Sequence, residues 1–573
     1  MVMKSRKGRD IFQFVIIVGI IILLNVIGSL EFFRVDLTSE KRYSLSDATI
    51  NLLESFDDVL YVKVYLEGDF PAGFQRLQRE TRQMLDEFRA YNGNIEYQFI
   101  NPDGSEDIQN NRELKQQLQY KGLKPSNLQI REQGGNKERE VYPGAILTYG
   151  DKEVPVLLLL DQFASSPERQ VNNSIQNLEF QLANGIRALI SSSKPSVAFL
   201  YGHGELEPRF IADFARSIGV NYSLDRFDIH KFRSDSLGEN ISIQDQQRKL
   251  NRFDALIIAK PREPFTDLDK YLLDQYIMNG GKVVWLLDAV HAEMDSLSEK
   301  SQFLSYPIYD RLRISDMLFR YGVRVNTNLV VDMISAGVSD RRSVHNWIYF
   351  PMVMPQVKHP ITKDLNAIKL DFASSIDTII APGVKKTVLL KSSPYSNVVS
   401  TPHMVSLQRL YEEQDETRFT RQFIPMGVLL EGRFESAFKN RILPKDSGPE
   451  QLKLKEKGDK TQMVVIGDGD IIRNQLNIVN PNIPKGTPLP LGFDQFTGQQ
   501  YGNKDFLLNV LDYMLDDSGL ISIRSRELKL RLLNPQKAKG DKLYWQLINT
   551  IVPVVIIILF GLVLTFIRKR KYA

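Results

Sequence analysis

The chain contains no cysteine among its 573 residues. This absence excludes disulfide bonds, thiolate catalysis, and zinc or iron–sulfur sites that are built on cysteine ligands. It leaves the cellular compartment open, because a large domain can be stable outside the cytoplasm without disulfides.

Several catalytic and metal-binding motifs are also missing. The chain has no G-x-x-x-x-G-K-[ST] loop, and Gly458-Asp-Lys-Thr461 only superficially matches one because Asp459 separates the glycine from the lysine. There is no G-x-S-x-G nucleophile elbow, and the six histidines form no H-x-x-x-H or H-E-x-x-H pair. The sequence therefore predicts no catalytic residue, no metal centre, no cofactor and no ATPase activity of its own.

Positive charge is concentrated at the two ends of the chain. The formal charge is +4, and removing eight terminal lysines and arginines leaves −4 for the remainder. The eight residues are Lys4, Arg6, Lys7, Arg9, Arg568, Lys569, Arg570 and Lys571. A slightly acidic body carries no basic footprint for nucleic acid, so no nucleic-acid partner is expected.

An uncharged run of twenty residues, Ile11–Leu30, follows the first basic cluster. As a helix it would cover about 30 Å, the hydrocarbon thickness of a bilayer. The alternative is a cleaved signal peptide, but its apolar region is usually shorter, and bulky residues follow Gly28 instead of a small-x-small cleavage site. We therefore predict an uncleaved first membrane span over residues 11–30.

A second uncharged run, Leu547–Ile567, precedes the last basic cluster. Tyr544 and Trp545 stand at its near edge like an interfacial aromatic belt, and Pro553 is tolerable because it falls in the first turns of the helix. Both spans have their positive charges on the terminal side. The positive-inside rule then places the basic tails 1–10 and 568–573 in the cytoplasm and residues 31–546 outside it.

Residues 31–193 are predicted to form the first domain of the extracytoplasmic body. The pattern of apolar residues gives the order βαβ–α–ββ–α, which is that of a thioredoxin-like α/β domain, and Ser46 is expected to cap its first helix. Tyr142-Pro143 precedes a strand where that fold often keeps a cis-proline. Because there is no cysteine, redox chemistry is excluded and the domain is predicted to be a scaffold.

Residues 194–342 show repeated strand–loop–helix units. The apolar strand Val197–Tyr201 ends at two glycines that bracket a histidine, and Phe253–Pro261 and Lys282–Asp288 are further buried strands. Thr266 is expected to cap a helix over Asp267–Met278. This pattern predicts a doubly wound parallel sheet of the flavodoxin/amidotransferase-like kind, with Asp288 and the His203 loop at one carboxyl edge.

The last part of the body is less regular. Residues 343–460 are predicted to be a β-rich region that ends in a charged linker. Residues 461–546 are predicted to return to the α/β domain with the strand Thr461–Ile466 and the helix Asp505–Leu515, and then to lead to the membrane. Two spans are too few to line a transport pathway, so energy and pore would come from partners.

Five stretches resemble one known family. They are Arg42-Tyr-Ser-Leu-Ser-Asp-Ala-Thr49, Tyr201-Gly-His-Gly-Glu205, Phe253–Asp288, Asp468-Gly-Asp470 and Asn503-Lys-Asp-Phe-Leu-Leu-Asn509. In these the chain resembles the GldG-type auxiliary, substrate-binding-like components of gliding-motility ABC transporters of Bacteroidota, and the similarity covers nearly the whole chain. The central domain is similar to one shared with intraflagellar-transport proteins and distantly to class I glutamine amidotransferases.

The resemblance implies an inner (cytoplasmic) membrane protein with a large periplasmic domain. Its partners would be a multi-span ABC permease, a separate ATP-binding subunit, the lipid bilayer, and other envelope components of gliding or secretion. The amidotransferase activity cannot be carried over, because the catalytic cysteine is absent. The expected function is that of a non-catalytic, membrane-anchored accessory subunit required for gliding motility.

The candidate ligand- or partner-binding residues lie in the loop after the first strand and at the end of a later one. They are Gly202, His203, Gly204, Glu205 and Asp288. The glycines permit a tight turn and close backbone approach, and His203 and Glu205 can bind a metal, a sugar hydroxyl or a partner's side chain. A purely structural turn is the alternative, and a glycan- or peptide-acting enzyme that uses this loop is the alternative function. Asp468 and Asp470 form a two-carboxylate loop, which is a weak indication of a cation.

Overall fold

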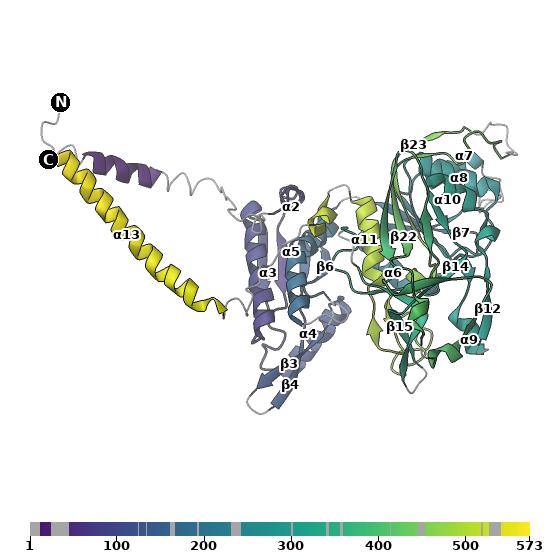
Figure 1. Ribbon diagram of the computed structural model, residues 1–573, viewed down its shortest axis with the longest axis horizontal. Coiled ribbons are helices and arrows are strands. Elements are labelled where there is room, and N and C mark those ends of the chain that lie inside the picture. Colours follow the sequence, from purple (N-terminus) through teal and green to yellow (C-terminus); the bar gives the residue numbers. More distant parts are fainter. Residues whose placement is uncertain are drawn as a thin grey trace. The chain divides into compact units, whose positions relative to one another are not determined.

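The computed structural model describes most of the chain. The described residues are 12–23, 45–123, 125–132, 135–160, 167–191, 194–230, 242–299, 302–339, 343–355, 359–412, 414–444, 453–516, 519–525 and 540–572. Figure 1 shows the elements in chain order. The chain divides into two units, one of residues 1–33 and 45–526 and the other of residues 34–44 and 527–573, and each is described by itself.

One described helix is long and apolar enough to cross a membrane. It is α13 (Lys542–Tyr572), which contains the predicted span Leu547–Ile567 and has Pro553 inside it. A shorter apolar helix covers Phe12–Leu23, and the other residues of the predicted first span lie outside the described residues. The basic tail 1–10, residues 445–452 of the predicted linker, and residues 526–539 are also outside them.

The N-terminal region of the first unit is a four-stranded sheet with helices packed on it. Its elements are α2 (Asp47–Leu53), β1 (Leu60–Val64), α3 (Ala72–Tyr91), β2 (Ile95–Phe99), α4 (Ile108–Tyr120), β3 (Ser126–Glu132), β4 (Gly135–Val141), β5 (Gly144–Tyr149), β6 (Lys152–Leu157) and α5 (Pro167–Ile190). The strand order is β2-β1-β5-β6, with β1 parallel to β2 and the other pairs antiparallel. The predicted cap is confirmed, because the Ser46 side chain accepts a hydrogen bond from the backbone N–H of Thr49.

Two details of this region differ from the sequence-based expectation. The Tyr142–Pro143 peptide bond is not cis, and among the described residues the cis bond is Thr401–Pro402. In addition, β4 pairs with β3 as a separate two-stranded hairpin, which the polar sequence of residues 135–141 did not indicate.

The core of the N-terminal region also receives a segment from far along the chain. The 3-10 helix η7 (Leu520–Ser525) contributes Leu520, Ile521 and Ile523 to the hydrophobic cluster that contains Leu45 and the β1 strand. Arg187 of α5 is paired with Asp512, at 3.1 Å, in the helix that precedes η7. The first and the last described residues of the body, near 45 and 525, therefore pack in the same hydrophobic core.

The centre of the molecule is a seven-stranded mixed sheet. Its strands are β7 (Ser196–Tyr201), β8 (Ser223–Asp228), β9 (Ala255–Ala259), β10 (Lys282–Leu286), β19 (Val384–Lys391), β22 (Pro425–Glu435) and β23 (Lys457–Ile466). The order is β19-β22-β23-β10-β9-β7-β8. The five strands from β23 to β8 are parallel, and β22 pairs antiparallel with both of its neighbours. The sheet is therefore not wholly parallel, because residues 343–460 supply two of its strands.

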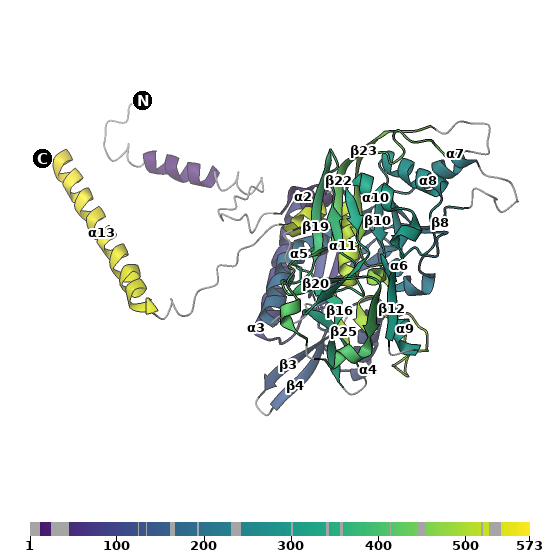
Figure 2. The same ribbon diagram turned by 45° about the vertical axis from the view of Figure 1, so that its right-hand side comes forward.

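Helices cover both faces of this sheet (Figure 2). They are α6 (Ala212–Ile218), α7 (Ile243–Leu250), α8 (Asp267–Met278), α10 (Ser315–Tyr321) and α11 (Asn503–Leu515). Successive side chains of a strand point to opposite faces. Accordingly Trp285 packs in the cluster that contains α8 and α10, whereas its neighbours Val284 and Leu286 pack in the cluster that contains α6 and α11. The predicted helix Asp267–Met278 is confirmed, with Thr266 as its cap.

Short strands and turns form the remaining layer. The strands are β11 (Val290–His291), β12 (Gln302–Pro307), β13 (Val323–Val325), β14 (Asn328–Asp332), β15 (Ser335–Ser339), β16 (Val344–Val353), β17 (Ile368–Lys369), β18 (Ile376–Thr378), β20 (Ser396–Ser400), β21 (His403–Ser406), β24 (Phe493–Asp494) and β25 (Gln499–Gln500). The helical elements are α9 (Met294–Glu299), η1 (Pro208–Phe210), η3 (Tyr309–Leu312), η4 (Leu407–Leu410), η5 (Glu416–Arg418) and η6 (Asp470–Ile472). Several of these strands share a hydrophobic cluster around Trp347 and Tyr349, whereas β13 and β18 pack in the cluster that contains α8 and α10.

Candidate functional site

The loops that follow β7, β9, β10 and β23 lie at one edge of the central sheet, because these strands are parallel. The loop after β7 requires its glycines, since Gly202 has φ +129° and Gly204 has φ +70°. The carbonyl of His203 accepts hydrogen bonds from the backbone N–H groups of Arg262 and Glu263, at 2.8 and 2.9 Å. The loop after β7 is thus attached to the loop after β9.

His203 points into a largely buried polar cluster. Its Nε2 lies 3.2 Å from Asp269 Oδ2, and His230 Nε2 lies 3.3 Å from the same oxygen. The His203 ring stacks on Phe265, with ring centroids 3.7 Å apart. Glu205 completes the group: its Oε2 accepts from the His203 backbone N–H at 2.8 Å, and its Oε1 lies 3.5 Å from His203 Nδ1. We call these four residues, His203, Glu205, His230 and Asp269, the histidine cluster.

The carboxylate of Asp269 has two roles. It is the third residue of the capping box at the start of α8, where Oδ2 accepts from the backbone N–H and Oγ1 of Thr266 at 2.8 and 2.7 Å. Burial alone would raise its pKa, but the hydrogen bonds from His203 and Thr266 prevail and lower the pKa of Asp269 to about 2. Burial likewise opposes the charge on His203, yet the neighbouring carboxylates of Asp269 and Glu205 raise the pKa of this imidazole.

Asp288 lies in a second cluster, around a buried lysine. Lys260 follows β9 in a left-handed conformation, with φ +56°, and its side chain is 2% exposed. Its Nζ lies 2.5 Å from Asp470 Oδ2, 3.0 Å from Asp288 Oδ2 and 3.5 Å from Glu293 Oε1. Burial opposes the positive charge, but the nearby carboxylates raise the pKa of Lys260 above its usual value. With Asp468, these residues form what we call the lysine cluster.

The turn after β23 supplies the rest of the lysine cluster. Asp468 accepts from the backbone N–H of Asp470 at 2.7 Å and from that of Asp371 at 2.8 Å, and Gly469 N–H donates to Asp288 Oδ1 at 2.6 Å. Burial, followed by the proximity of Asp470 and Asp288, raises the pKa of Asp468 well above its usual value. The loop with Asp468 and Asp470, noted in the sequence, therefore lies against Asp288.

The structure thus divides the candidate residues between two clusters. His203 and Glu205 belong to the first and Asp288 to the second, and no contact between His203 and Asp288 is found among the described residues. Sequence reasoning missed His230, Lys260 and Asp269. Asp269 showed only the signal of a helix-capping residue, and Lys260 only that of a strand end before Pro261.

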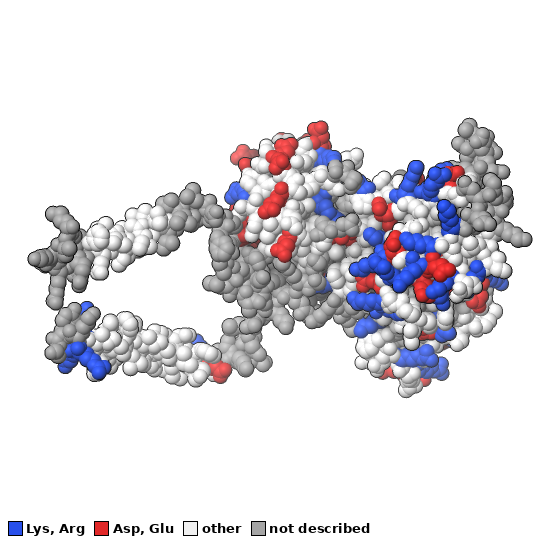
Figure 3. All heavy atoms as spheres, turned by 90° about the horizontal axis from the view of Figure 1, so that it is seen from above, with Lys and Arg blue, Asp and Glu red and all other residues white. Residues whose placement is uncertain are grey.

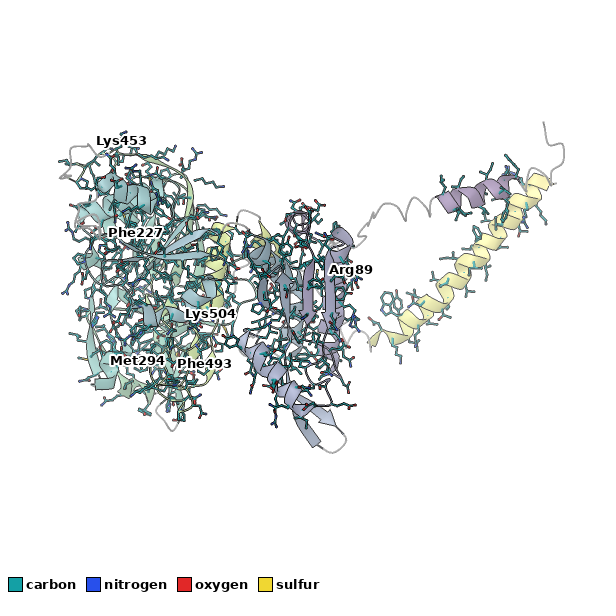
Figure 4. All side chains as sticks on the ribbon, turned by 180° about the vertical axis from the view of Figure 1, so that it is seen from behind. Arg89, Phe227, Met294, Lys453, Phe493 and Lys504 are labelled. Carbon is teal, nitrogen blue, oxygen red and sulfur yellow. The ribbon has the colours of Figure 1, made fainter. Side chains whose placement is uncertain are left out.

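A cavity of about 540 Å³ borders the lysine cluster. Its aromatic lining includes Phe210, Phe350, Phe372, Phe493, Phe496 and Tyr501, and its charged lining is Asp295, Lys369, Asp371, Asp470, Arg473 and Asp494. Met294 and Phe493, labelled in Figure 4, are among the lining residues. The volume is in the range of small-molecule sites.

The charges around this cavity are largely paired with one another. Lys369 Nζ lies 3.2 Å from Asp371 Oδ1 and 4.3 Å from the centre of the Phe350 ring. Arg473 lies over Phe210 and 3.6 Å from Asp470. On the outer surface, basic and acidic side chains are interspersed over the face shown in Figure 3, whereas α13 is white along most of its length.

The fold is therefore that of a mixed α/β protein. Two polar clusters and a cavity lie at the edge of its central sheet where the parallel strands end. Residues 194–510 match the model of a family described as "ABC-type uncharacterized transport system". The match covers more than half of the chain, and the chain belongs to this family. Residues 39–148 also match a domain of unknown function.

Two individual proteins are similar to the chain. An uncharacterized protein of Borreliella burgdorferi (strain ATCC 35210 / DSM 4680 / CIP 102532 / B31) is 20% identical over 584 residues and covers 99% of both chains. A solved structure titled "mmIFT52 N-terminal domain" covers 56% of this chain and 96% of its own, with 13% identity and a TM-score of 0.31. The family is an auxiliary component of transport systems, and membership implies a permease and an ATPase as partners in general.

Proposed function

We propose that the protein is a non-catalytic, membrane-anchored accessory subunit of an ABC transporter. The observation that carries this proposal is the family match over residues 194–510, which includes the whole edge that bears both polar clusters. The chain has no phosphate-binding loop and no cysteine, so ATP hydrolysis and transport would be performed by a separate ATP-binding subunit and a multi-span permease.

Anchoring at both ends is part of the proposal. The helix α13 has the length and composition of a membrane span, and Phe12–Leu23 is apolar as well. With basic residues on the terminal side of each, both termini would lie in the cytoplasm and the body in the periplasm of a cell with an inner membrane.

The order of the strands supports the proposed domain folds. In the N-terminal region, a parallel pair followed by two antiparallel strands agrees with a thioredoxin-like scaffold. In the central sheet, the five parallel strands run second, first, third, fourth, fifth in chain order, which is the flavodoxin-like arrangement. Ligands of such sheets bind outside the carboxyl ends of the strands, and we propose that contact with a substrate or partner occurs at that edge.

A role in gliding motility is supported by the GldG-type motifs quoted above. Of these, Gly202–Glu205 and Asp468–Asp470 each belong to one of the two clusters. A deletion strain of a gliding host would test this part: loss of spreading with normal growth is expected, and normal spreading would contradict it.

Purification of the full chain in mild detergent tests the accessory role. We expect a multi-span permease and an ATPase to be recovered with it, and a two-span membrane protein of similar abundance is the control. Repeated recovery of neither partner, with an intact and folded chain, would contradict the proposal.

The alternative is an extracytoplasmic glycan- or peptide-acting enzyme that uses the His203 loop. The His203 side chain is 0% exposed and stacks on Phe265, and this arrangement favours a non-catalytic role because a general acid or base must reach its substrate. Replacing Glu205 by Gln distinguishes the two hypotheses. The accessory role predicts normal partner recovery without any change in a chemical product, whereas loss of a detectable hydrolase activity would support the enzyme.

A further inference from the structure

We propose that the histidine cluster binds one divalent transition-metal ion, with zinc as the best match, through His203, His230 and Asp269. This proposal does not depend on the proposed transport role. The three side chains offer two imidazole nitrogens and a carboxylate, all within 4.8 Å of one another. Imidazole and carboxylate groups are ordinary ligands of zinc.

Two of the three spacings between ligand atoms fit a metal better than direct ion pairing. Zinc bonds to nitrogen and oxygen of about 2.0–2.1 Å place neighbouring ligands of a tetrahedron about 3.3–3.4 Å apart. The two imidazole nitrogens lie 3.2 and 3.3 Å from Asp269 Oδ2. Charge-assisted hydrogen bonds between such groups are usually about 2.7–2.9 Å long, so the observed distances are long for that interaction.

Three buried polar atoms in the same cluster lack hydrogen-bond partners. They are His203 Nδ1, Glu205 Oε1 and Asp269 Oδ1. Asp269 Oδ2, the oxygen that faces both imidazole nitrogens, also accepts two hydrogen bonds from Thr266, and Oδ1 accepts none. Two of them, His203 Nδ1 and Glu205 Oε1, lie 3.5 Å from each other, whereas Asp269 Oδ1 has no such neighbour; because an unsatisfied buried carboxylate oxygen is costly, it points to a ligand.

Glu205 has the position of a supporting carboxylate. If His203 binds the ion through Nε2, its opposite nitrogen, Nδ1, carries a proton and faces Glu205 Oε1 at 3.5 Å. Metal-binding histidines almost always donate their other N–H to such a group, which fixes the tautomer of the ring. Glu205 is itself fixed by the backbone N–H of His203, at 2.8 Å.

The charges also balance. The carboxylates of Glu205 and Asp269 are both buried, with side chains 4% and 0% exposed. One divalent ion with two neutral imidazoles would neutralise both carboxylates. The side chain of His230 is 31% exposed, so an ion has a way in and a fourth ligand can come from solvent or a partner.

The lysine cluster does not make a competing site. Although Asp288, Asp468 and Asp470 also bring three carboxylates together, the Lys260 ammonium already contacts two of them, and backbone N–H groups bond to Asp288 and Asp468. The protein thus supplies its own cation there.

A zinc titration of the full-length protein tests the proposal. The protein in mild detergent is stripped with a chelator, desalted, and titrated with zinc chloride against a chromophoric zinc chelator, while thermal unfolding is followed in parallel. We expect one zinc ion per chain and a higher Tm with zinc. Absence of saturable binding at one ion per chain would overturn the proposal.

Matched variants locate the site. His230→Gln changes a partly exposed ligand and is expected to keep the fold while weakening zinc binding more than about 100-fold, whereas Glu205→Gln keeps all three ligands and should weaken it about 10- to 100-fold. His291→Gln, outside the cluster, should bind like the wild type. Unchanged affinity in His230→Gln, or an equal loss in His291→Gln, would refute the assignment.

Discussion

The histidine cluster and the lysine cluster occupy neighbouring loops at one edge of the same sheet, yet they balance buried charge differently. In the lysine cluster, one ammonium group lies between Asp288 and Asp470, and backbone N–H groups bond to the surrounding carboxylates. In the histidine cluster, two imidazoles face one carboxylate oxygen and three buried atoms have no hydrogen-bond partner. The lysine cluster supplies its own cation and leaves one buried oxygen, Asp470 Oδ1, without a hydrogen bond, whereas the histidine cluster leaves three buried atoms without one and is the less complete of the two.

This difference suits the lysine cluster to a structural role and the histidine cluster to a binding role at the same edge of the central sheet. A buried charge is tolerated when it is paired and hydrogen-bonded, so a complete cluster favours a fixed loop geometry. An incomplete cluster gains more from a ligand, because the ligand satisfies groups that folding leaves unsatisfied. Substitutions in the two clusters should therefore have different consequences.

The largest expected effect is that of Lys260→Met. Removing the ammonium leaves Asp288 and Asp470 buried without their cation, and we expect a loss of about 3–5 kcal/mol in the free energy of unfolding, measured by urea denaturation. Lys385→Met is the control, since that side chain is 73% exposed and should cost less than about 0.5 kcal/mol. Similar stabilities of the two variants would show that the Lys260 ammonium is not what stabilises the buried carboxylates of the lysine cluster.

Two glycine substitutions compare how tightly the loops are packed. A Cβ at Gly469 would lie 2.7 Å from Lys260 Cβ and 3.0 Å from Asp288 Oδ1, so Gly469→Ala should destabilise the protein by about 1–3 kcal/mol. At Gly204 the nearest atoms are 3.5 Å away, and Gly204→Ala should cost only about 1 kcal/mol, for its positive φ. Thermal unfolding of both variants measures the difference, and the reverse order would argue against the tighter packing of the lysine cluster.

The smallest effect is the pH dependence of the Lys260→Met penalty. A carboxyl whose folded pKa is raised contributes stability below its unfolded pKa and loses it as pH rises through the folded value. Burial already raises the pKa values of Asp288 and Asp468, and the variant has no ammonium to oppose this. The loss of unfolding free energy caused by Lys260→Met should therefore be smaller at about pH 5 than at about pH 8. The difference should be about 1 kcal/mol for each unit by which the substitution raises the carboxyl pKa further. In the wild-type protein, Lys260 stays charged over this whole pH range, because its own pKa is raised from 10.5. A penalty independent of pH would contradict this account.

Much of the architecture follows from local sequence signals. Periodicity and capping placed α8 and α11 close to their observed bounds, because each has an apolar face and α8 also has a clear end signal, Asn279-Gly280. The antiparallel strands β19 and β22 were not assigned to the central sheet. Their apolar residues show only that they are buried, and strand pairing over long sequence distances leaves no local signal.

The candidate site was less accessible to sequence reasoning for a related reason. His203 was recognised because two glycines surround it, but its partners His230 and Asp269 come from the loop after β8 and from the first turn of α8. No fixed spacing connects these positions, so a search for histidine pairs on one helix could not find them. Lys260 resembles any other lysine at the end of a strand until the fold encloses it.

The return of η7 to the core around Leu45 has a mechanical consequence. The polypeptide enters and leaves the body through the same hydrophobic core. All elements from β7 to α11 lie between α5 and η7 in the sequence, and both α5 and η7 belong to that core. A pull applied along the backbone at residues 45 and 525 would be borne by the N-terminal region. The central sheet and its two clusters would lie outside the line of tension.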